Sequence, residues 1–376
     1  MKPDSNDLAS LRDKIDDLDR RLVDLLAERG GVVAEVAEWK RAHDQPVYHP
    51  AREEDLISRR RAQGLGVGLD PDLVEDIFRR VMRDSRQTQG ATLASHGVRP
   101  GARVLVVGGA GAMGRCLTRW FSEAGYRVAV LDRDDWGRVE PLCEGAELTI
   151  LSVPIEATAA VAARLAPHLP ARCVLADVTS IKSGPMAAML AAHPGPVLGL
   201  HPMFGPTTTS LDKQIVVATP GREAAACQWL LDQLAAWGAV IVTANAADHD
   251  ETMGFVQALR HFASFAFGQY LYRKGVDLHR TLDFSAPIYR LELGMVGRLF
   301  AQDPGLYAEI IFATPERRTL LREYIESVAE NVRMIEAGDR DTFIAEFGRI
   351  AEWFGPFSDQ AIRESSYLID KLVERF

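Results

Sequence analysis

The stretch VLVVGGAGAMGR, residues 104–115, joins a short apolar run to three glycines with the spacing G-x-G-x-x-G. The run predicts a buried strand, and the residues after it predict a helix. In such a turn Gly109 allows a tight bend, Gly111 lets the backbone approach a pyrophosphate, and Gly114 permits close packing of helix against strand. The free N–H groups of the helix N-terminus then face the phosphates. The stretch therefore predicts a dinucleotide-binding α/β domain.

Short apolar runs alternate with helical segments around this stretch. They are YRVAVLD, ELTILSV, CVLADV and VLGL, and IVVAT and AVIVT extend the series. This alternation is typical of a parallel sheet of the Rossmann type. Asp132 ends one run where an acid would accept hydrogen bonds from the adenosine ribose and repel a 2′-phosphate. We therefore expect NAD rather than NADP, with Met113 and Ser152 also at the cofactor.

Ligands of an open α/β sheet bind beyond the carboxyl ends of its strands. The segment LGLHPMFGP, residues 198–206, places His201 there among prolines, and Ser180 and Lys182 follow a neighbouring run. An imidazole beside a nicotinamide can accept a hydrogen bond or proton from a hydroxyl whose carbon loses hydride. His201 is thus predicted to be catalytic. The alternatives are a structural turn at His201, a helix N-cap at Ser180 and a solvated side chain at Lys182.

Residues 7–42 carry a heptad seam, which predicts one long helix. The apolar positions of the seam are Leu8, Leu11, Ile15, Leu18, Leu22, Leu25, Val32, Val36 and Trp39. Such a helix spans roughly 55 Å and needs a partner, most economically the same helix of a second subunit. Arg29 interrupts the seam. Two shorter helices begin near Ala51 and at Asp70–Pro71, and Ser85 and Gln89 occupy inward positions of the last one.

From about Asn245 the sequence predicts helices almost throughout. In SAPIYRLELGMVGRLF, Arg290 and Arg298 are eight residues apart, within about 80° on a helix that is otherwise apolar. A buried arginine needs an anion, and a substrate carboxylate suits its planar guanidinium. The alternative is a structural ion pair, for example with Glu292. His249 and His261 fall on different helix faces, so we expect no metal site.

Bulk composition restricts the class of partner. The 376 residues are 47% hydrophobic and 25% charged, and the net charge of −9 argues against nucleic acid. No apolar run reaches the roughly 18–20 residues that span a bilayer. The first residues, MKPDSNDLAS, lack the apolar core of a signal peptide, so a cytoplasmic location is expected. The four cysteines are isolated in the sequence and are interpreted as small core residues.

Over nearly its whole length the sequence resembles the bifunctional chorismate mutase–prephenate dehydrogenases of bacterial tyrosine biosynthesis. The most specific matches are LRDKIDDLDRRLVDLLAERG, VVGGAGAMGR, GPVLGLHPMFGP, ALRHFASFAFG and SAPIYRLELGMVGRLFAQDP. The resemblance implies a homodimer in which each chain has three domains. The domains are an all-helical mutase domain at 1–90, an NAD-binding Rossmann-type domain at 103–245, and a helical substrate and dimerisation domain at 246–376. A linker at 91–102 joins the first two.

For the mutase, the resemblance implies that chorismate is held by Arg12, Arg29, Lys40, Arg52, Glu53, Ser85 and Gln89. Arginines would bind the two carboxylates, and Arg12 would reach the site of the partner subunit. Lys40 and Gln89 would donate to the breaking ether oxygen, and Glu53 would orient the ring hydroxyl. The rearrangement to prephenate needs no nucleophile, because fixing a compact conformer and stabilising charge suffice. His49 stands where family members often carry Asp.

For the dehydrogenase, the resemblance implies oxidative decarboxylation of prephenate to 4-hydroxyphenylpyruvate. His201 would accept the hydrogen bond of the ring hydroxyl, with support from Ser180. Substrate binding would involve Arg298, Arg290, Lys182 and His261. Feedback inhibition by tyrosine is also implied. Three alternatives remain at this point: an arogenate dehydrogenase, a simple hydroxy-acid dehydrogenase with a non-catalytic helical dimerisation domain, and an NAD-sensing regulator without an enzymatic role.

Overall fold

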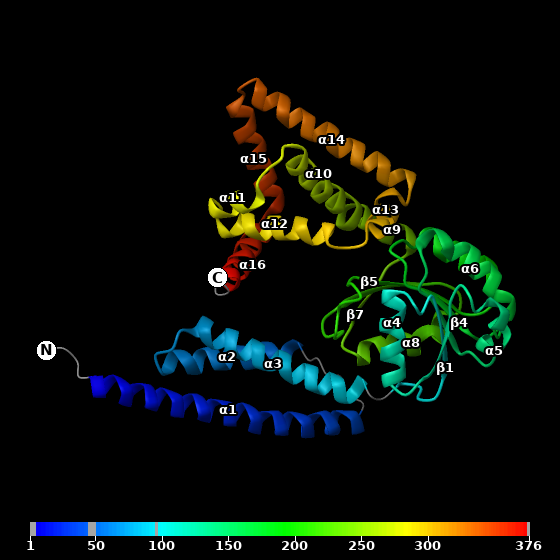
Figure 1. Cartoon of the computed structure of the whole chain (residues 1–376), viewed down its shortest axis with the longest axis horizontal. Helices are drawn as coiled ribbons and strands as arrows, with labels where there is room; N and C mark the ends of the chain where they lie inside the picture. The colour runs from blue at the N-terminus through cyan, green and yellow to red at the C-terminus, as the bar shows by residue number, and fades with distance from the viewer. Residues whose placement is uncertain (1–4, 44–49, 95–96, 374–376) are drawn as a thin grey trace. The chain divides into compact units, whose positions relative to one another are not determined.

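A computed structural model describes residues 5–43, 50–94 and 97–373 (Figure 1). Its contacts divide the chain into two compact units, Met1–Ala246 and Ala247–Phe376. The first unit contains three N-terminal helices and a seven-stranded sheet with its covering helices. In the second unit, every regular element that the structure describes is helical, as the sequence predicts.

The N-terminal helices are α1 (Ser5–Ala42), α2 (Pro50–Gly66) and α3 (Pro71–Ala94). Helix α3 packs on both of the others. The long helix runs through Gly30–Gly31 without a break, and Asp70 Oδ1 accepts the N–H of Asp72 at 2.9 Å, as expected of a residue that opens a helix. One boundary differs from the prediction. Helix α3 continues to Ala94, into the segment expected as a linker, because a single glycine at position 90 weakens a helix without stopping it.

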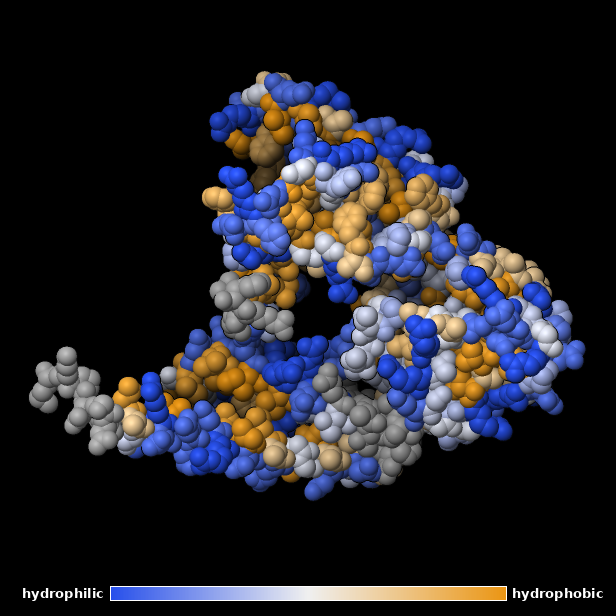
Figure 2. All heavy atoms as spheres, in the orientation of Figure 1, coloured by the Kyte–Doolittle hydropathy of each residue, from blue (hydrophilic) through white to orange (hydrophobic). Residues whose placement is uncertain are grey.

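The predicted seam of α1 faces away from α2 and α3 along most of its length. Leu18 is 57% exposed, Leu22 is 54% exposed and Trp39 is 57% exposed. Figure 2 shows apolar residues gathered over these helices. Exposed apolar surface of this extent and regular spacing is typical of an interface, and a second copy of α1 would match its heptad period.

The sheet has the strand order β2-β1-β3-β4-β5-β6-β7. The strands are β1 (Arg103–Val107), β2 (Arg127–Leu131), β3 (Leu148–Leu151), β4 (Val174–Asp177), β5 (Val197–Pro202), β6 (Ile215–Pro220) and β7 (Val240–Thr243). The first five are parallel, which confirms the Rossmann-type prediction. Strand β6, however, runs antiparallel to β5. Two parallel strands need a crossover connection, usually a helix, that returns the chain to the starting end of the first strand. The segment 203–214 between β5 and β6 contains no helix, so the expectation of a fully parallel sheet was wrong.

Helices cover both faces of the sheet (Figure 1). Helices α4 (Ala112–Glu123) and α8 (Ala224–Ala236) pack on one face, and α5 (Val139–Cys143), α6 (Thr158–Leu165) and α7 (Ser183–Ala192) pack on the other. Strand β1 shows the alternation directly, since Val104 and Val106 face the first core and Leu105 and Val107 the second. All four cysteines are buried free thiols, as predicted.

The second unit begins with a helix whose register shifts midway. Helix α9 (Ala246–Met253) passes into a π-helical stretch, Gly254–Leu259, and then into α10 (Arg260–Arg273). The apolar pattern does not predict that stretch. The remaining helices are α11 (Leu278–Asp283), α12 (Pro287–Phe300), α13 (Pro304–Phe312), α14 (Pro315–Glu336), α15 (Arg340–Phe354) and α16 (Pro356–Val373). Within the described ranges, no helix is long and apolar enough to cross a membrane.

The exposed seam predicts that α1 pairs with α1 of a second subunit. Replacing Leu18 and Leu22 together by Asp places charges in that interface, so the dissociation constant of the dimer should rise at least about tenfold. Arg20→Asp, on the other side of the same helix, is the control and should keep the dissociation constant of the unaltered protein. Sedimentation equilibrium measures both, and an unchanged dissociation constant for the double variant would contradict the assignment.

Candidate active sites

The glycine-rich turn after β1 is packed too tightly for side chains. A Cβ at Gly109 would lie 2.5 Å from Val130 Cγ1, and one at Gly114 would lie 2.1 Å from Gly108 O. The tight bend itself occurs at Gly108, whose φ is +82°, rather than at Gly109 as the sequence suggested. Gly111 is the N-cap of α4, so the helix N-terminus opens at the turn. This is the cradle that a pyrophosphate requires.

Asp132 lies beside this turn, immediately after β2. Its Oδ2 accepts the N–H of Ala110 at 3.0 Å, and its own N–H donates to Asp135 Oδ2 at 3.0 Å. The carboxylate is therefore held in place and half-buried, with acceptor capacity left for ribose hydroxyls. The arrangement fits a dinucleotide.

Met113 and Ser152, both predicted to bind the cofactor, lie close to the glycine-rich turn but are largely occupied by contacts within the protein. The Met113 side chain packs against the core on the α4 face of the sheet, so only part of it is exposed toward a ligand. Ser152 is half-buried at the end of β3, and its N–H donates to Val107 O at 2.8 Å. Its carbonyl oxygen lies 2.3 Å from where a Cβ of Gly108 would be. Ser152 thus borders the turn.

His201 lies within β5, opposite Val217 of β6, and is 2% exposed. The sequence placed it just after the strand. It is the penultimate residue of β5, and its backbone is held by the pairing of β5 with β6. A buried imidazole at the carboxyl end of a central strand has the fixed placement that a catalytic base requires.

Lys182 is completely buried and is neither solvated nor directed at open solvent. Its Nζ donates to Asp177 Oδ2 at 2.5 Å and to Leu200 O at 2.7 Å. Asp177, which the sequence analysis did not single out, is also completely buried. The pair connects the end of β4 to the residue before His201, so Lys182 holds the backbone beside His201. Ser180 is half-buried and is not an N-cap, because Lys182 is the cap residue of α7.

A second site lies among the N-terminal helices. Arg29 Nη1 donates to Ser85 Oγ at 2.5 Å, and Ser85 Oγ in turn donates to Val81 O at 2.8 Å. Both residues line a pocket of about 300 Å³ between α1 and α3. The other lining residues are Leu26, Gly30, Val33, Arg80, Val81, Asp84 and Thr88. The sequence analysis did not predict Arg80 and Asp84 as site residues. They lie one helical turn apart, and charged residues at this spacing are equally typical of an exposed helix face.

The N-terminal helices also hold a group of neighbouring charges. Burial lowers the pKa of Lys40, the nearby Glu53 opposes that shift, and the nearby Arg52 adds to it, so the three charges are close neighbours. Gln89 is 8% exposed, and among the described residues its Oε1 has no hydrogen-bond partner. A buried amide oxygen of this kind favours a ligand with a donor group.

Arg12 is exposed on α1, seventeen residues before Arg29. That separation corresponds to about 25 Å along a helix, so the two arginines of one subunit cannot bind one chorismate-sized molecule. Any role of Arg12 at a site must therefore be in the partner subunit. His49 lies outside the described residues.

The predicted substrate residues of the second unit differ in exposure. Arg298 is exposed within one chain, although the sequence predicted it to be buried. Arg290 is half-buried, and its Nη2 donates to Leu282 O at 3.0 Å, so it ties α12 to α11. His261 is buried, with its ring packed edge-on against Tyr307 at 4.8 Å between centroids. Burial, reinforced by Arg260, lowers the pKa of His261 to about 4, so its imidazole is neutral at physiological pH.

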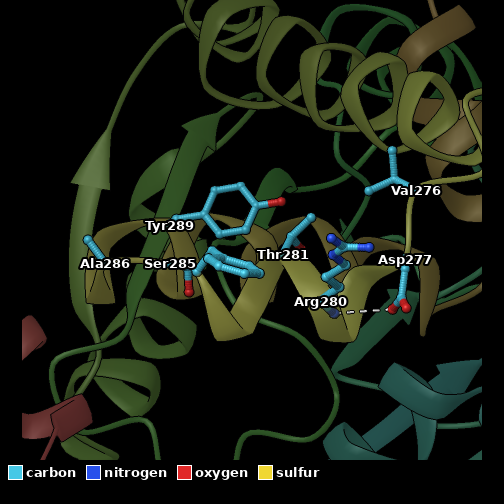
Figure 3. A pocket seen from close by; sticks show the side chains of 8 residues that line it. Val276, Asp277, Arg280, Thr281, Ser285, Ala286 and Tyr289 are labelled. Carbon is cyan, nitrogen blue, oxygen red and sulfur yellow. Dashed lines mark hydrogen bonds between the residues drawn. The ribbon is translucent and has the colours of Figure 1, made fainter.

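A cavity of about 650 Å³ adjoins α11 (Figure 3). Its charged and aromatic lining residues are Asp277, Arg280, Phe284 and Tyr289. In Figure 3 the hydroxyl end of Tyr289 points toward Thr281 and Arg280. Sequence reasoning did not find this cavity, because its residues belong to a short helix and its flanking turns. Within the described residues, no group of three or more potential metal ligands occurs.

Comparison with known families accounts for both sites. Residues 11–90 match type II chorismate mutases, residues 123–243 the nucleotide-binding domain of prephenate dehydrogenases, and residues 245–349 their dimerization domain. The T-protein of Enterobacter agglomerans is 46% identical over 96% of this chain and 97% of its own length. The chain belongs to the T-protein family. It is a bifunctional enzyme of tyrosine biosynthesis that rearranges chorismate to prephenate and oxidatively decarboxylates prephenate with NAD.

Two further relatives have the same organisation or fold. The T-protein of Haemophilus influenzae is 41% identical over 97% of both chains. The crystal structure of prephenate dehydrogenase from A. aeolicus, in complex with hydroxyphenyl propionate and NAD+, superimposes with a TM-score of 0.54. It is 18% identical and covers 67% of this chain and 96% of its own, so it shows a shared fold. The dimerization domain indicates a dimer.

Close packing at Gly114 predicts a sharp effect of one methyl group. In Gly114→Ala the new Cβ would meet backbone atoms at 2.1 and 2.7 Å, so the turn must open and NAD+ affinity should fall by at least about tenfold. Gly137→Ala is the control, since nothing lies within 4 Å of its Cβ position. Titration calorimetry with NAD+ measures both variants, and normal affinity of Gly114→Ala would disprove the assigned role.

Proposed function

We propose that the pocket between α1 and α3 is the chorismate mutase site and that His201 is the catalytic base of the dehydrogenase. The observation that carries the first assignment is the pocket between α1 and α3, which two arginines, Arg29 and Arg80, line together with Ser85. Because the protein has a net charge of −9, it can bind an anion only where basic side chains lie close together. Chorismate carries two carboxylates.

In the mutase reaction, Arg29 and Arg52, with Arg12 of the partner subunit, would hold the two carboxylates in the compact conformer. Ser85 fixes the Arg29 guanidinium. Lys40 and the amide of Gln89 would donate hydrogen bonds to the ether oxygen as its bond breaks. Glu53 would accept a hydrogen bond from the ring hydroxyl and so orient it. These groups need only be placed correctly, because a rearrangement within one molecule is accelerated by orientation and by stabilisation of developing charge.

In the dehydrogenase reaction, the His201 imidazole would accept the hydrogen bond of the ring hydroxyl and take its proton as the hydroxyl carbon is oxidised. Ser180, at the end of the neighbouring strand, would support that hydroxyl. NAD+ supplies a hydride acceptor when bound at the glycine-rich turn. Lys182 and Asp177 hold the strand end that carries His201. Arg298, Arg290 and His261 would contact the substrate or shape its site.

The proposal also includes the division of the chain into domains and its location in the cell. The mutase domain would comprise residues 1–90, the linker 91–102, the NAD-binding domain 103–245 and the helical domain 246–376. Four free, buried thiols are in keeping with a cytoplasmic location, where disulfides are rare.

Two variants separate the proposed sites. Arg29→Ala should lower chorismate turnover about 100-fold or more and leave oxidation of supplied prephenate within about twofold. His201→Asn should do the reverse, since losing a general base costs about 100- to 10,000-fold. His279→Asn, at an exposed position of the second unit, is the control for both assays. Absorbance of chorismate and of NADH gives the two rates, and a variant that loses neither activity disproves its assignment.

We also propose that tyrosine inhibits the dehydrogenase by binding the cavity beside α11. Arg280 would pair with its carboxylate, Asp277 with its ammonium group, and Phe284 and Tyr289 would contact its ring. Tyrosine should lower NADH formation from prephenate, and Arg280→Gln should raise the half-inhibitory concentration about tenfold while Arg273→Gln, at an exposed site of α10, leaves it unchanged. Absence of inhibition would reject the inhibitor, and full inhibition of Arg280→Gln would reject the site.

A further inference from the structure

The Glu53 carboxylate is held by cations from two different domains. Its Oε1 accepts Arg86 Nη1 at 2.5 Å, and its Oε2 accepts Lys213 Nζ at 3.3 Å. The side chains of Glu53 and Arg86 are only 15% and 10% exposed. Arg86 belongs to α3, but Lys213 lies in the segment 203–214 that joins β5 to β6. A residue of the nucleotide-binding domain therefore contacts a carboxylate assigned to the mutase.

Asp212 extends this contact into an alternating row of charges. Arg86 Nε donates to both carboxylate oxygens of Asp212, at 3.0 and 2.9 Å. Asp212 is 14% exposed. In the order Asp212, Arg86, Glu53, Lys213, neighbouring charges are always of opposite sign. Partly buried guanidinium–carboxylate pairs fix geometry as well as supplying attraction, so the row restricts where the Glu53 carboxylate can lie.

The segment that carries Asp212 and Lys213 is anchored to the sheet. Leu211 is buried in the sheet core at 3% exposure, and the Lys213 N–H donates to Gly238 O at 2.9 Å. Lys213 has φ +58°, in the left-handed region that residues with a Cβ adopt at a cost. Such a conformation persists where surrounding structure imposes it, and it is enriched at functional sites. Here it directs a lysine at Glu53.

We propose that Asp212 and Lys213, residues of the nucleotide-binding domain, are positioning residues for the rearrangement of chorismate. Lys213 holds Glu53 directly, and Asp212 holds it through Arg86. This inference rests on the proposed role of Glu53 in accepting the ring hydroxyl. Each carboxylate oxygen has two lone pairs, so both contacts leave acceptor capacity for the substrate. Mutase turnover then depends on the dehydrogenase part of the chain, although Asp212 and Lys213 touch no chorismate.

The test uses the full-length protein with chorismate as substrate. Asp212→Asn and Lys213→Met should each lower mutase kcat/KM about tenfold, because a misplaced orienting group loses much of its effect. Lys213→Arg keeps the charge and should restore most of the activity. Arg172→Met, at an exposed position of the same domain, is the control and should stay within about twofold of the unaltered enzyme. NAD+ affinity, measured for every variant, reports that the sheet remains folded.

A double-mutant cycle separates positioning from general stabilisation. If Lys213 acts through Glu53, Lys213→Met should cause no further loss when added to Glu53→Gln. An equal loss in both backgrounds would show a structural role and overturn the proposal, as would normal turnover of both Asp212→Asn and Lys213→Met. Normal turnover of Glu53→Gln alone would instead reject the role of Glu53 on which the proposal rests.

Discussion

The buried ion pair between Lys182 and Asp177 holds together the part of the sheet on which the dehydrogenase depends. It connects the end of β4 to Leu200 O, one residue before His201. A buried charge without a partner is very unfavourable, so each member of the pair fixes the other. Ser152, at the end of the adjacent strand β3, borders the glycine-rich turn. The proposed catalytic base and the proposed cofactor site thus lie along the same edge of the sheet.

The helical mutase follows a different constraint. The helices α1, α2 and α3 bury few residues among themselves, and the seam of α1 stays exposed within one chain. Three such helices bury little apolar surface alone, so pairing of the seam with a second subunit would stabilise them. Arg12, too far along α1 to reach its own pocket, fits this arrangement. In the proposed mutase site, dimerisation and catalysis are therefore linked.

Much of the fold could be predicted from local sequence patterns. The heptad seam predicted α1, and the apolar runs predicted all seven strands. Patterns of this kind carry no information about pairing direction, which is why antiparallel β6 was missed. Burial was also hard to predict. Lys182 and Arg298 are both cations beside apolar residues, yet one is completely buried and the other exposed, because long-range packing decides the difference. The contacts of Asp212 and Lys213 join segments more than a hundred residues apart and leave no local signal.

One chain carries out two consecutive reactions. The most direct test supplies the purified protein with chorismate alone, follows its disappearance, and then adds NAD+ and follows NADH. We expect loss of chorismate without cofactor, followed by NADH formation at the expense of the accumulated prephenate. If chorismate is untouched while supplied prephenate still yields NADH, the N-terminal helices serve dimerisation only, and the cationic pocket at Arg29 is not an active site.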